Sequence, residues 1–263
     1  MPSVKQRVQD RYGWIRLAEA RNKLVLGHTA LAPRRLEDAE VARLAPTLPA
    51  RTGRALVAVV IPTYRRPEGV VRALGSVLAQ TVEDLVVIVV DDGAGLPDLP
   101  ADPRVVAVSL SRNSGIAGVV RNVGLRLTDS EYVAFLDDDN TWRPDHLETA
   151  LRRLRDPDQP RVDAVYTALR RVLPDGRERD ILSVPFDRRR AAGQAFLDIN
   201  AFVARRSPAI RFSRIRRGRE VVPVEDWEMI FRYSRRHAIA HVPVPTVDYL
   251  INPESYWTVW RPD

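Results

Sequence analysis

The chain of 263 residues contains no cysteine, which excludes disulfide bonds and catalysis by a thiolate. It also contains no apolar run near the roughly 20 residues that a membrane-spanning helix needs. The first ten residues, MPSVKQRVQD, lack the apolar segment of a secretory signal. These three absences lead us to expect a cytoplasmic protein, either free or held at the inner face of a membrane.

Lysine is scarce as well, so the net charge of +7 is carried almost entirely by arginine. Such a charge favours anionic partners, among them nucleotide phosphates, lipid phosphates and membrane surfaces. The arginines are scattered and match no DNA- or RNA-binding motif, so we expect no nucleic-acid partner. Hydrophobic residues make up 45% of the chain, which is enough for a sizeable core.

Residues 1–54 are predicted to form a helical extension. Apolar residues at helical spacing predict helices at 4–26 and 35–45, followed by a linker at 46–54. The first helix has more apolar residues than a solvated helix needs: Tyr12, Trp14, Ile15, Leu17, Leu24 and Leu26. We therefore predict that it packs on the rest of the chain or on a second subunit in a homodimer. Peripheral contact with a membrane surface is the alternative.

From residue 56 onward, short apolar runs rich in β-branched residues alternate with amphipathic segments. Buried strands are predicted at 56–61, 85–90, 105–110 and 132–136, and helices at 68–80 and 115–127. This alternation is typical of βαβ units on a parallel sheet. The later pattern is less regular, with helices predicted at 146–154 and 225–237 and strands at 164–173, 181–184 and 238–244.

Polar loops follow three of the predicted buried strands. They are residues 62–66, the pair Asp91 and Asp92, and the run Asp137, Asp138 and Asp139. Ligands of open α/β sheets bind outside the carboxyl ends of the strands. We therefore expect the three loops to meet at one edge of the sheet.

The three consecutive acids repel one another unless a cation lies between them. Divalent cations such as Mg²⁺ take oxygen ligands and often share them with phosphates. The sequence therefore predicts a metal and phosphate site at Asp137, Asp138 and Asp139. The alternative is an exposed acidic turn that caps the next helix.

Five motifs in this order resemble family 2 glycosyltransferases of the GT-A fold. They lie at residues 59–64, 91–93, 112–115 with 121–124, 131–139 with Pro144, and 225–227. The resemblance covers about residues 56–260, is strongest over 56–147, and leaves 1–54 outside. It implies a Rossmann-like, mostly parallel α/β sheet flanked by helices, with the N-terminal helical extension. The implied divisions are 1–54, a donor-binding half at 55–147 and an acceptor-binding half at 148–263.

The resemblance also implies a donor site. Asp139 would ligate Mn²⁺ or Mg²⁺ against the donor diphosphate, and Asp137 or Asp138 would hold the ribose or act through water. Asp92 would accept a hydrogen bond from the base, typically from N3 of uracil; the alternative is that Asp91 and Asp92 cap the turn before Gly93. The remaining implied donor residues are Pro62, Thr63, Tyr64, Arg65 and Arg112.

On the acceptor side the resemblance places the general base at Asp226, in the first turn of a predicted helix. An inverting transfer needs a carboxylate that takes the proton of the acceptor hydroxyl. Glu225 lies beside it, and Trp227 either braces the helix or stacks on a sugar. The alternative is that both acids only stabilise the helix, because negative charge in the first turn interacts favourably with the helix dipole. Arg121 is expected either to set its helix against the sheet or to pair with an acid.

The predicted function is an inverting, metal-dependent transfer of one sugar from a nucleotide sugar, typically a UDP-sugar. The acceptor would be a hydroxyl of a saccharide, a lipid-linked molecule or a small molecule. A nucleotidyltransferase is one alternative, but the loop after the first strand has no glycine before Gly69. A non-catalytic nucleotide- or sugar-binding protein is the other. A dinucleotide-binding dehydrogenase is excluded because no Gly-X-Gly-X-X-Gly follows that strand.

Overall fold

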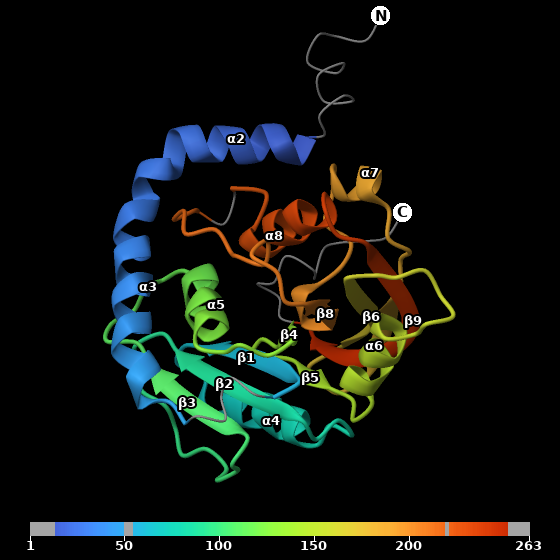
Figure 1. Cartoon of the computed structure of the whole chain (residues 1–263), viewed down its shortest axis with the longest axis horizontal. Coiled ribbons are helices and arrows are strands. Elements are labelled where there is room, and N and C mark those ends of the chain that lie inside the picture. The colour runs from blue at the N-terminus through green and yellow to red at the C-terminus, as the bar shows by residue number, and fades with distance from the viewer. Residues whose placement is uncertain (1–13, 50–54, 219–220, 252–263) are drawn as a thin grey trace, which may run out of the picture.

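The computed structural model describes residues 14–49, 55–218 and 221–251, and its sheet joins a parallel half to a largely antiparallel half (Figure 1). In the parallel half, β1 (Val57–Thr63) lies between β2 (Leu85–Asp91) and β4 (Tyr132–Phe135). The edge strand β3 (Val105–Ser109) pairs with β2. β1 and β2 are nearly continuous runs of buried apolar residues, as expected of strands covered on both faces.

The second half of the sheet starts where β8 (Phe202–Arg205) pairs antiparallel with β4. β6 (Ala164–Val172) follows, flanked by β8 and by β9 (Ile239–Leu250), and β7 (Glu178–Leu182) also pairs with β6. The short β5 (Thr141–Trp142) pairs with β9. The two predicted halves of the chain therefore share one sheet.

Two predicted strands in this half have wrong boundaries. β7 begins at Glu178 rather than at 181, and β9 continues to Leu250 rather than ending at 244. Pro243 and Pro245 suggest a strand end, because proline cannot donate to a neighbouring strand. The pairing of β9 with β6 instead shifts register near Ala168, and this irregularity accommodates the prolines.

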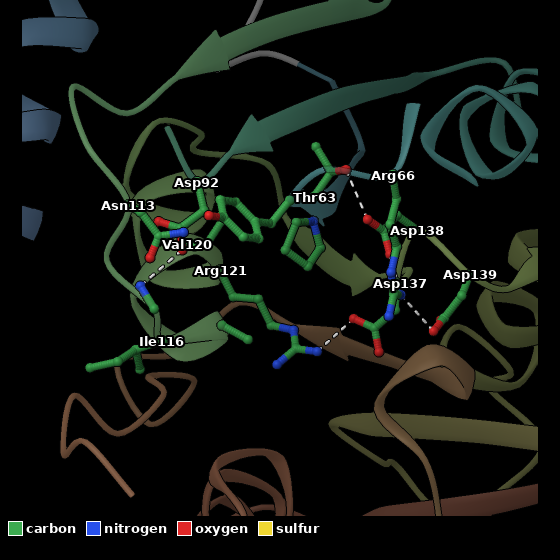
Figure 2. Close-up of a pocket in the computed structure, with 14 residues that line it drawn as sticks. Thr63, Arg66, Asp92, Asn113, Ile116, Val120, Arg121, Asp137, Asp138 and Asp139 are labelled. Carbon is green, nitrogen blue, oxygen red and sulfur yellow. Dashed lines mark hydrogen bonds and ion pairs between the residues drawn. The ribbon is translucent and has the colours of Figure 1, made fainter. Parts of the chain in front are cut away.

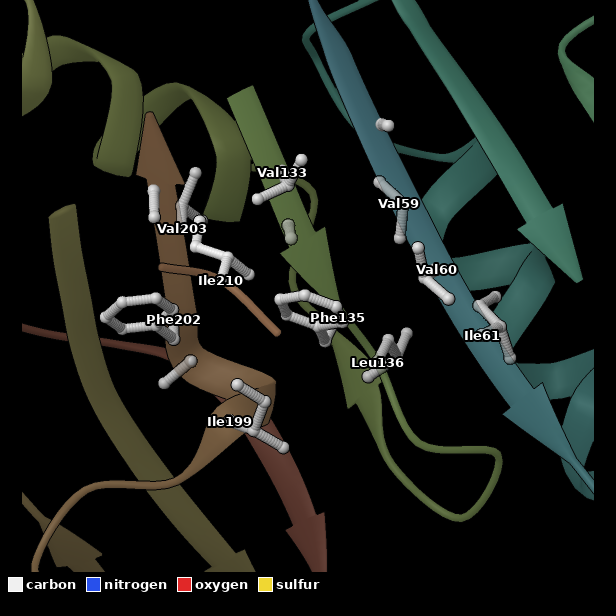
Figure 3. Packing of buried hydrophobic residues seen from close by; sticks show 14 of the residues in the cluster. Val59, Val60, Ile61, Val133, Phe135, Leu136, Ile199, Phe202, Val203 and Ile210 are labelled. Carbon is white, nitrogen blue, oxygen red and sulfur yellow. The ribbon is translucent and has the colours of Figure 1, made fainter. Parts of the chain in front are cut away.

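The remaining helices are α4 (Pro67–Leu78), α5 (Ala117–Arg126), α6 (His146–Leu154), α7 (Arg188–Ala191), α8 (Glu225–Ser234) and the short η4 (Ile199–Ala201). α4 and α5 pack on β1, α6 packs on β6, and α7 packs on α8. The core between β1, β4 and β8 is filled by Val60, Phe135 and Phe202, among other residues (Figure 3). Gly124 of α5 lies so close to Val60 that a β-carbon would clash, so α5 packs directly onto β1.

The extension forms a long arm along one side of the molecule (Figure 1). It consists of α2 (Trp14–Leu26), η1 (Gly27–Ala30), α3 (Leu31–Leu44) and η2 (Ala45–Thr47). α3 starts four residues before the predicted helix, with Pro33 in its first turn, where proline is well tolerated. Residues 4–13 of the first predicted helix, with Tyr12, and residues 50–54 of the predicted linker lie outside the described residues.

Contacts of both long helices confirm that the arm packs on the rest of the chain. In α3, the carboxylate of Glu37, fully buried, receives hydrogen bonds from Arg214, Arg126 and Asn122. At the start of α2, the ring of Trp14 stacks on Trp227 with centroids 5.7 Å apart. Within the described ranges, no helix is both long and apolar enough to cross a membrane.

Candidate active site

A cavity of about 480 Å³ opens at the carboxyl ends of β1, β2 and β4 (Figure 2). The three polar loops predicted to meet do meet here. The cavity is lined by seven of the predicted residues: Pro62, Thr63, Tyr64, Asp92, Asp137, Asp138 and Asp139. Arg121 of α5 and Arg66, which was not among the predicted site residues, complete its polar wall.

Two of the predicted donor residues lie outside this lining. Arg65 has a φ of 56° and places its guanidinium 5.0 Å from the ring centre of Tyr64. Arg112 lines a second cavity, of about 250 Å³, which also includes Arg216 and Pro33 of the extension. Neither arginine contributes to the wall around the acids.

The cations that the three acids require are supplied by the chain itself. Asp137 accepts a hydrogen bond from Nη2 of Arg121 at 2.5 Å. Nη1 of Arg66 lies 2.9 Å from Oδ1 of Asp138 and 2.8 Å from Oδ2 of Asp139. Two guanidinium groups therefore offset part of the negative charge of the acid loop, Asp137 to Asp139.

The acid loop is also held by neutral groups. The hydroxyl of Thr63 donates to Oδ2 of Asp138 at 2.8 Å, and the amide of Asn200 donates to Asp137 at 3.1 Å. Gly69, in the first turn of α4, lies so close to the carbonyl of Asp138 that a β-carbon would clash. The loop is thus fixed by β1, α4 and η4.

Burial raises the pKa of both Asp138 and Asp139. For Asp139 the charge of Asp137 adds to this effect, while the guanidinium of Arg66 opposes it for both groups. A cation beside these carboxylates, whether arginine or a metal ion, favours their ionised form.

The residues present fit a divalent metal of the predicted kind in one respect. Asp139 lines the cavity. Its Oδ2 accepts from Nη1 of Arg66, so it already binds a cation, and its Oδ1 accepts from Nδ2 of Asn140 at 3.0 Å. Among the described residues, no group of three or more acids or histidines forms a metal cage. A metal at Asp139 would therefore need oxygen ligands from a bound phosphate as well.

Asp91 and Asp92 play different parts at the end of β2. Asp91 accepts from the backbone N–H groups of Ala94 and Gly95, so it caps the turn. Asp92 accepts from the N–H groups of Ser114 at 2.7 Å and Gly115 at 3.0 Å. An ionised carboxylate has about four lone-pair sites, so Asp92 keeps capacity for a ligand in the cavity.

Arg121 connects the acid loop to the acceptor side. Its side chain is buried, and Nη1 lies 3.1 Å from Oε1 of Glu225 in the first turn of α8. Arg121 therefore pairs with two acids, Asp137 and Glu225, and these charges raise its pKa against the opposing effect of burial. Glu225 therefore forms an ion pair with Arg121 in addition to any interaction with the helix dipole.

Burial raises the pKa of Asp226 to about 7, and the charges of Glu225 and Asp198 add to this effect. One carboxylate oxygen of Asp226 accepts from the backbone N–H of Trp227 at 2.6 Å. Burial also raises the pKa of Asp198, to about 6. Asp226 is thus a carboxylate with a strongly raised pKa next to Glu225, and it does not itself line the cavity.

Trp227 is packed rather than presented to a ligand. Its side chain stacks on Trp14, its Nε1 donates to the carbonyl of Ala191 at 2.8 Å, and it is 7% exposed. Trp227 therefore anchors α8 through packing, which is one of its two predicted roles. Trp14 of the extension supplies the ring on which it packs.

Sequence reasoning missed three residues at this site, Arg66, Asp198 and Asn200. Arg66 is adjacent to the predicted Arg65, and only the left-handed backbone of Arg65 shows which of the two reaches the acids. Asp198 and Asn200 lie in an irregular segment before β8, where no periodic pattern marks them.

A sequence model described as Glycosyl transferase family 2 matches residues 58–213. Succinoglycan biosynthesis protein ExoW of Rhizobium meliloti (strain 1021) is 40% identical over 109 residues, which cover 38% of this chain and 34% of that protein. Poly(ribitol-phosphate) beta-N-acetylglucosaminyltransferase TarP of Staphylococcus aureus (strain N315) is 29% identical over 156 residues, covering 56% and 46%. The chain thus spans between about a third and a half of the length of these relatives.

Solved structures with the same fold include S. aureus TarS 1-349 in complex with UDP-GlcNAc. It aligns with a TM-score of 0.57 and 18% identity, covering 78% of this chain and 61% of that one. Mannosyltransferase PcManGT from Pyrobaculum calidifontis, in complex with GDP-Man and Mn²⁺, aligns with a TM-score of 0.52 and 16% identity, covering 88% and 70%. At such identities the likeness concerns the fold, and the predicted GT-A type of α/β fold is confirmed.

Proposed function

Because the chain belongs to glycosyl transferase family 2, we propose that it transfers one sugar, with inversion, from a nucleotide sugar to an acceptor hydroxyl. The observation that carries the proposal is the cavity at the strand ends. It brings the acid loop and Arg121 together, and Arg121 reaches Glu225, the neighbour of Asp226. A donor diphosphate and an acceptor hydroxyl need these two groups of acids within reach of each other.

On the donor side, we assign the diphosphate to the acid loop and the nucleobase to the part of the cavity near Asp92. Asp139 would hold Mn²⁺ or Mg²⁺, which neutralises the charge that develops on the leaving diphosphate. Asp92 would accept from N3–H of uracil, and Thr63 and Tyr64 would line the base and ribose. TarS binds UDP-GlcNAc, and we propose a UDP-sugar for this chain too.

On the acceptor side, we assign the general base to Asp226. A base is most effective when its pKa lies near the working pH, and burial with two neighbouring acids raises the pKa of Asp226 to about 7. Arg121 pairs with Glu225, the residue before Asp226, and so fixes the first turn of α8. Trp14 and Trp227 brace the same helix from outside the cavity.

A thermal-shift screen tests the donor assignment. A ligand that binds only the folded protein stabilises it by about 2.7 kcal/mol at 100 times its Kd. For a chain of this size we expect UDP with Mn²⁺ to raise the Tm by about 5 °C or more. GDP and ADP with Mn²⁺, and UDP with EDTA, should give smaller shifts. Equal shifts for all nucleoside diphosphates, or none, would refute the assignment of uracil to Asp92.

We also propose that the outer face of the extension contacts an anionic membrane surface. Leu17, Leu24, Val25 and Leu31 of the extension are exposed, Leu24 by 87%. Exposed cations flank them at Arg16, Arg21, Lys23, Arg34 and Arg35. Glu19, the one acid between residues 14 and 36, is buried and paired with Lys23, and Arg34 lies 3.9 Å from the exposed Asp38, which leaves Arg16, Arg21 and Arg35 as the remaining cations. Apolar side chains surrounded by positive charge are complementary to anionic lipid, and this favours a lipid-linked acceptor.

The double substitution Leu24→Glu with Leu31→Glu should reduce co-sedimentation with phosphatidylglycerol-containing vesicles at least tenfold. Each exposed leucine contributes about 1.5–3 kcal/mol when it is buried in an apolar environment. The matched control is Ile181→Glu, which changes an exposed apolar residue on β7. Vesicle binding that the double variant retains would refute the proposal. Loss of a dimer in light scattering, with no vesicle binding by the wild type, would assign the surface to a second copy instead.

A further inference from the structure

The guanidinium of Arg66 lies in the position of a cation shared by two carboxylates. A single nitrogen, Nη1, is within 2.9 Å of Asp138 and 2.8 Å of Asp139 (Figure 2). The side chain of Arg66 is 48% exposed, whereas that of Asp138 is 7% exposed. Arg66 therefore reaches the acids from the open side of the cavity.

The oxygens that Arg66 occupies are the ones a metal would need. The other oxygen of Asp138 accepts from Thr63, and the other oxygen of Asp139 accepts from Asn140. A metal bound through Oδ2 of Asp139 would lie where Nη1 of Arg66 now lies. Because like charges repel, the two cations compete for this place.

The second guanidinium of the site is held differently. Arg121 is buried, with its side chain 6% exposed, and is paired with Asp137 through Nη2 and with Glu225 through Nη1. It also lies 5.3 Å from the ring centre of Phe212. Of these two arginines, Arg66 is thus the one placed to exchange its partners without breaking the packing around α5.

We propose that Arg66 is a replaceable cation: it holds Asp138 and Asp139 in the absence of donor, gives way to the metal, and then binds the donor diphosphate. The inference rests on the proposed function, since it requires a metal and a diphosphate at this cavity. Guanidinium groups match phosphate oxygens as well as carboxylates, so the released side chain has a partner in the diphosphate. Metal and nucleoside diphosphate then bind cooperatively, and each raises the affinity for the other by the same factor.

Arg66→Met removes the charge and keeps most of the aliphatic stem. We expect this variant to bind Mn²⁺ without nucleotide at least fivefold more tightly than the wild type, as measured from the free-ion signal in electron paramagnetic resonance. We expect its affinity for UDP at saturating Mn²⁺, measured by calorimetry, to fall at least tenfold. Arg66→Lys, which keeps a cation, should stay close to the wild type in the first measurement.

The matched control is Arg72→Met, which removes an exposed arginine from α4, the helix that Arg66 precedes, and should change neither affinity. Should Arg66→Met prove unfolded by circular dichroism, Arg66→Gln replaces it with the same expected results. Unchanged or weaker Mn²⁺ binding by the Arg66 variants, alongside Mn²⁺-dependent UDP binding by the wild type, overturns the inference alone. Wild-type UDP binding that does not depend on Mn²⁺ overturns both the inference and the metal in the proposed function.

Discussion

Asp226→Asn should lower turnover at least 100-fold while leaving the affinity for UDP unchanged. Asparagine keeps the size of the side chain and its acceptor for the N–H of Trp227, but it cannot take a proton at neutral pH. Assistance by a general base contributes about 10²–10⁴-fold to a rate. Turnover is measured as nucleoside diphosphate released from the donor in the presence of acceptor, and affinity by calorimetry.

The pH dependence of turnover should identify the same group. Because burial and two neighbouring acids raise the pKa of Asp226 to about 7, the ionised base becomes available as the pH rises through 7. Wild-type turnover should rise about tenfold per pH unit below that value and level off above it. In Asp226→Asn the small remaining turnover should lose this acidic limb.

Asp226 should also limit the stability of the folded protein. Its folded pKa lies above its ordinary value of 3.8, so its contribution to stability is present below about pH 4 and is lost as the pH rises through 7. A pKa difference of one between the folded and unfolded protein corresponds to about 1.4 kcal/mol of stability. Asp226→Asn removes this cost, so at pH 8 its Tm should exceed that of the wild type by at least about 2–4 °C. Near pH 4 the two proteins should have similar Tm values.

The control for the Asp226 variant is a substitution of its neighbour, Glu225. Glu225→Gln keeps hydrogen bonding to Arg121 but removes a charge, so its effect on turnover should be milder than that of Asp226→Asn. Near wild-type turnover in Asp226→Asn would return the acid to a role at the start of α8. A loss of UDP affinity in proportion to turnover would instead place Asp226 on the donor side.

The parallel half of the fold could be predicted from sequence because each strand carries its own signal. The apolar runs of β1, β2 and β4 are buried on both faces, so their composition is nearly independent of the rest of the chain. The end of β9 depends instead on a register shift in its partner β6, and no feature of β9 alone encodes that shift. Local patterns therefore located the strand ends that form the cavity but not the far boundary of the sheet.

The acid loop shows a similar limit for the site. Repulsion among Asp137, Asp138 and Asp139 predicts a cation, but it does not say which one. In the structure the cations are Arg66, 72 residues before Asp138, and Arg121, 16 residues before Asp137. Pairing across such separations depends on the packing of α4 and α5 against the sheet, which the sequence indicates only in outline. The presence of a cation at the loop was thus predictable, whereas the residues that supply it were not.

Asp139→Ala should abolish the metal-dependent part of UDP binding, lowering the affinity at saturating Mn²⁺ at least 100-fold, or about 2.7 kcal/mol. The fold should survive, because the side chain is 33% exposed and contacts Arg66 and Asn140 at the surface of the cavity. Asp138→Ala differs, since that buried group also holds Thr63 and its loss should lower the Tm.

Calorimetry with Mn²⁺ and with EDTA separates the two parts of binding in Asp139→Ala. The uracil base of UDP would still contact Asp92 and the loop before α5. Weak UDP binding that is the same with and without Mn²⁺ should therefore remain. The matched control is Asp158→Ala, which removes an exposed acid from the loop after α6 and should behave as the wild type. If UDP binding by Asp139→Ala is undiminished and still requires Mn²⁺, then Asp139 is no metal ligand. The cation at this loop would in that case be held by Asp137 or Asp138, and the exchange with Arg66 would have to take place at Asp138.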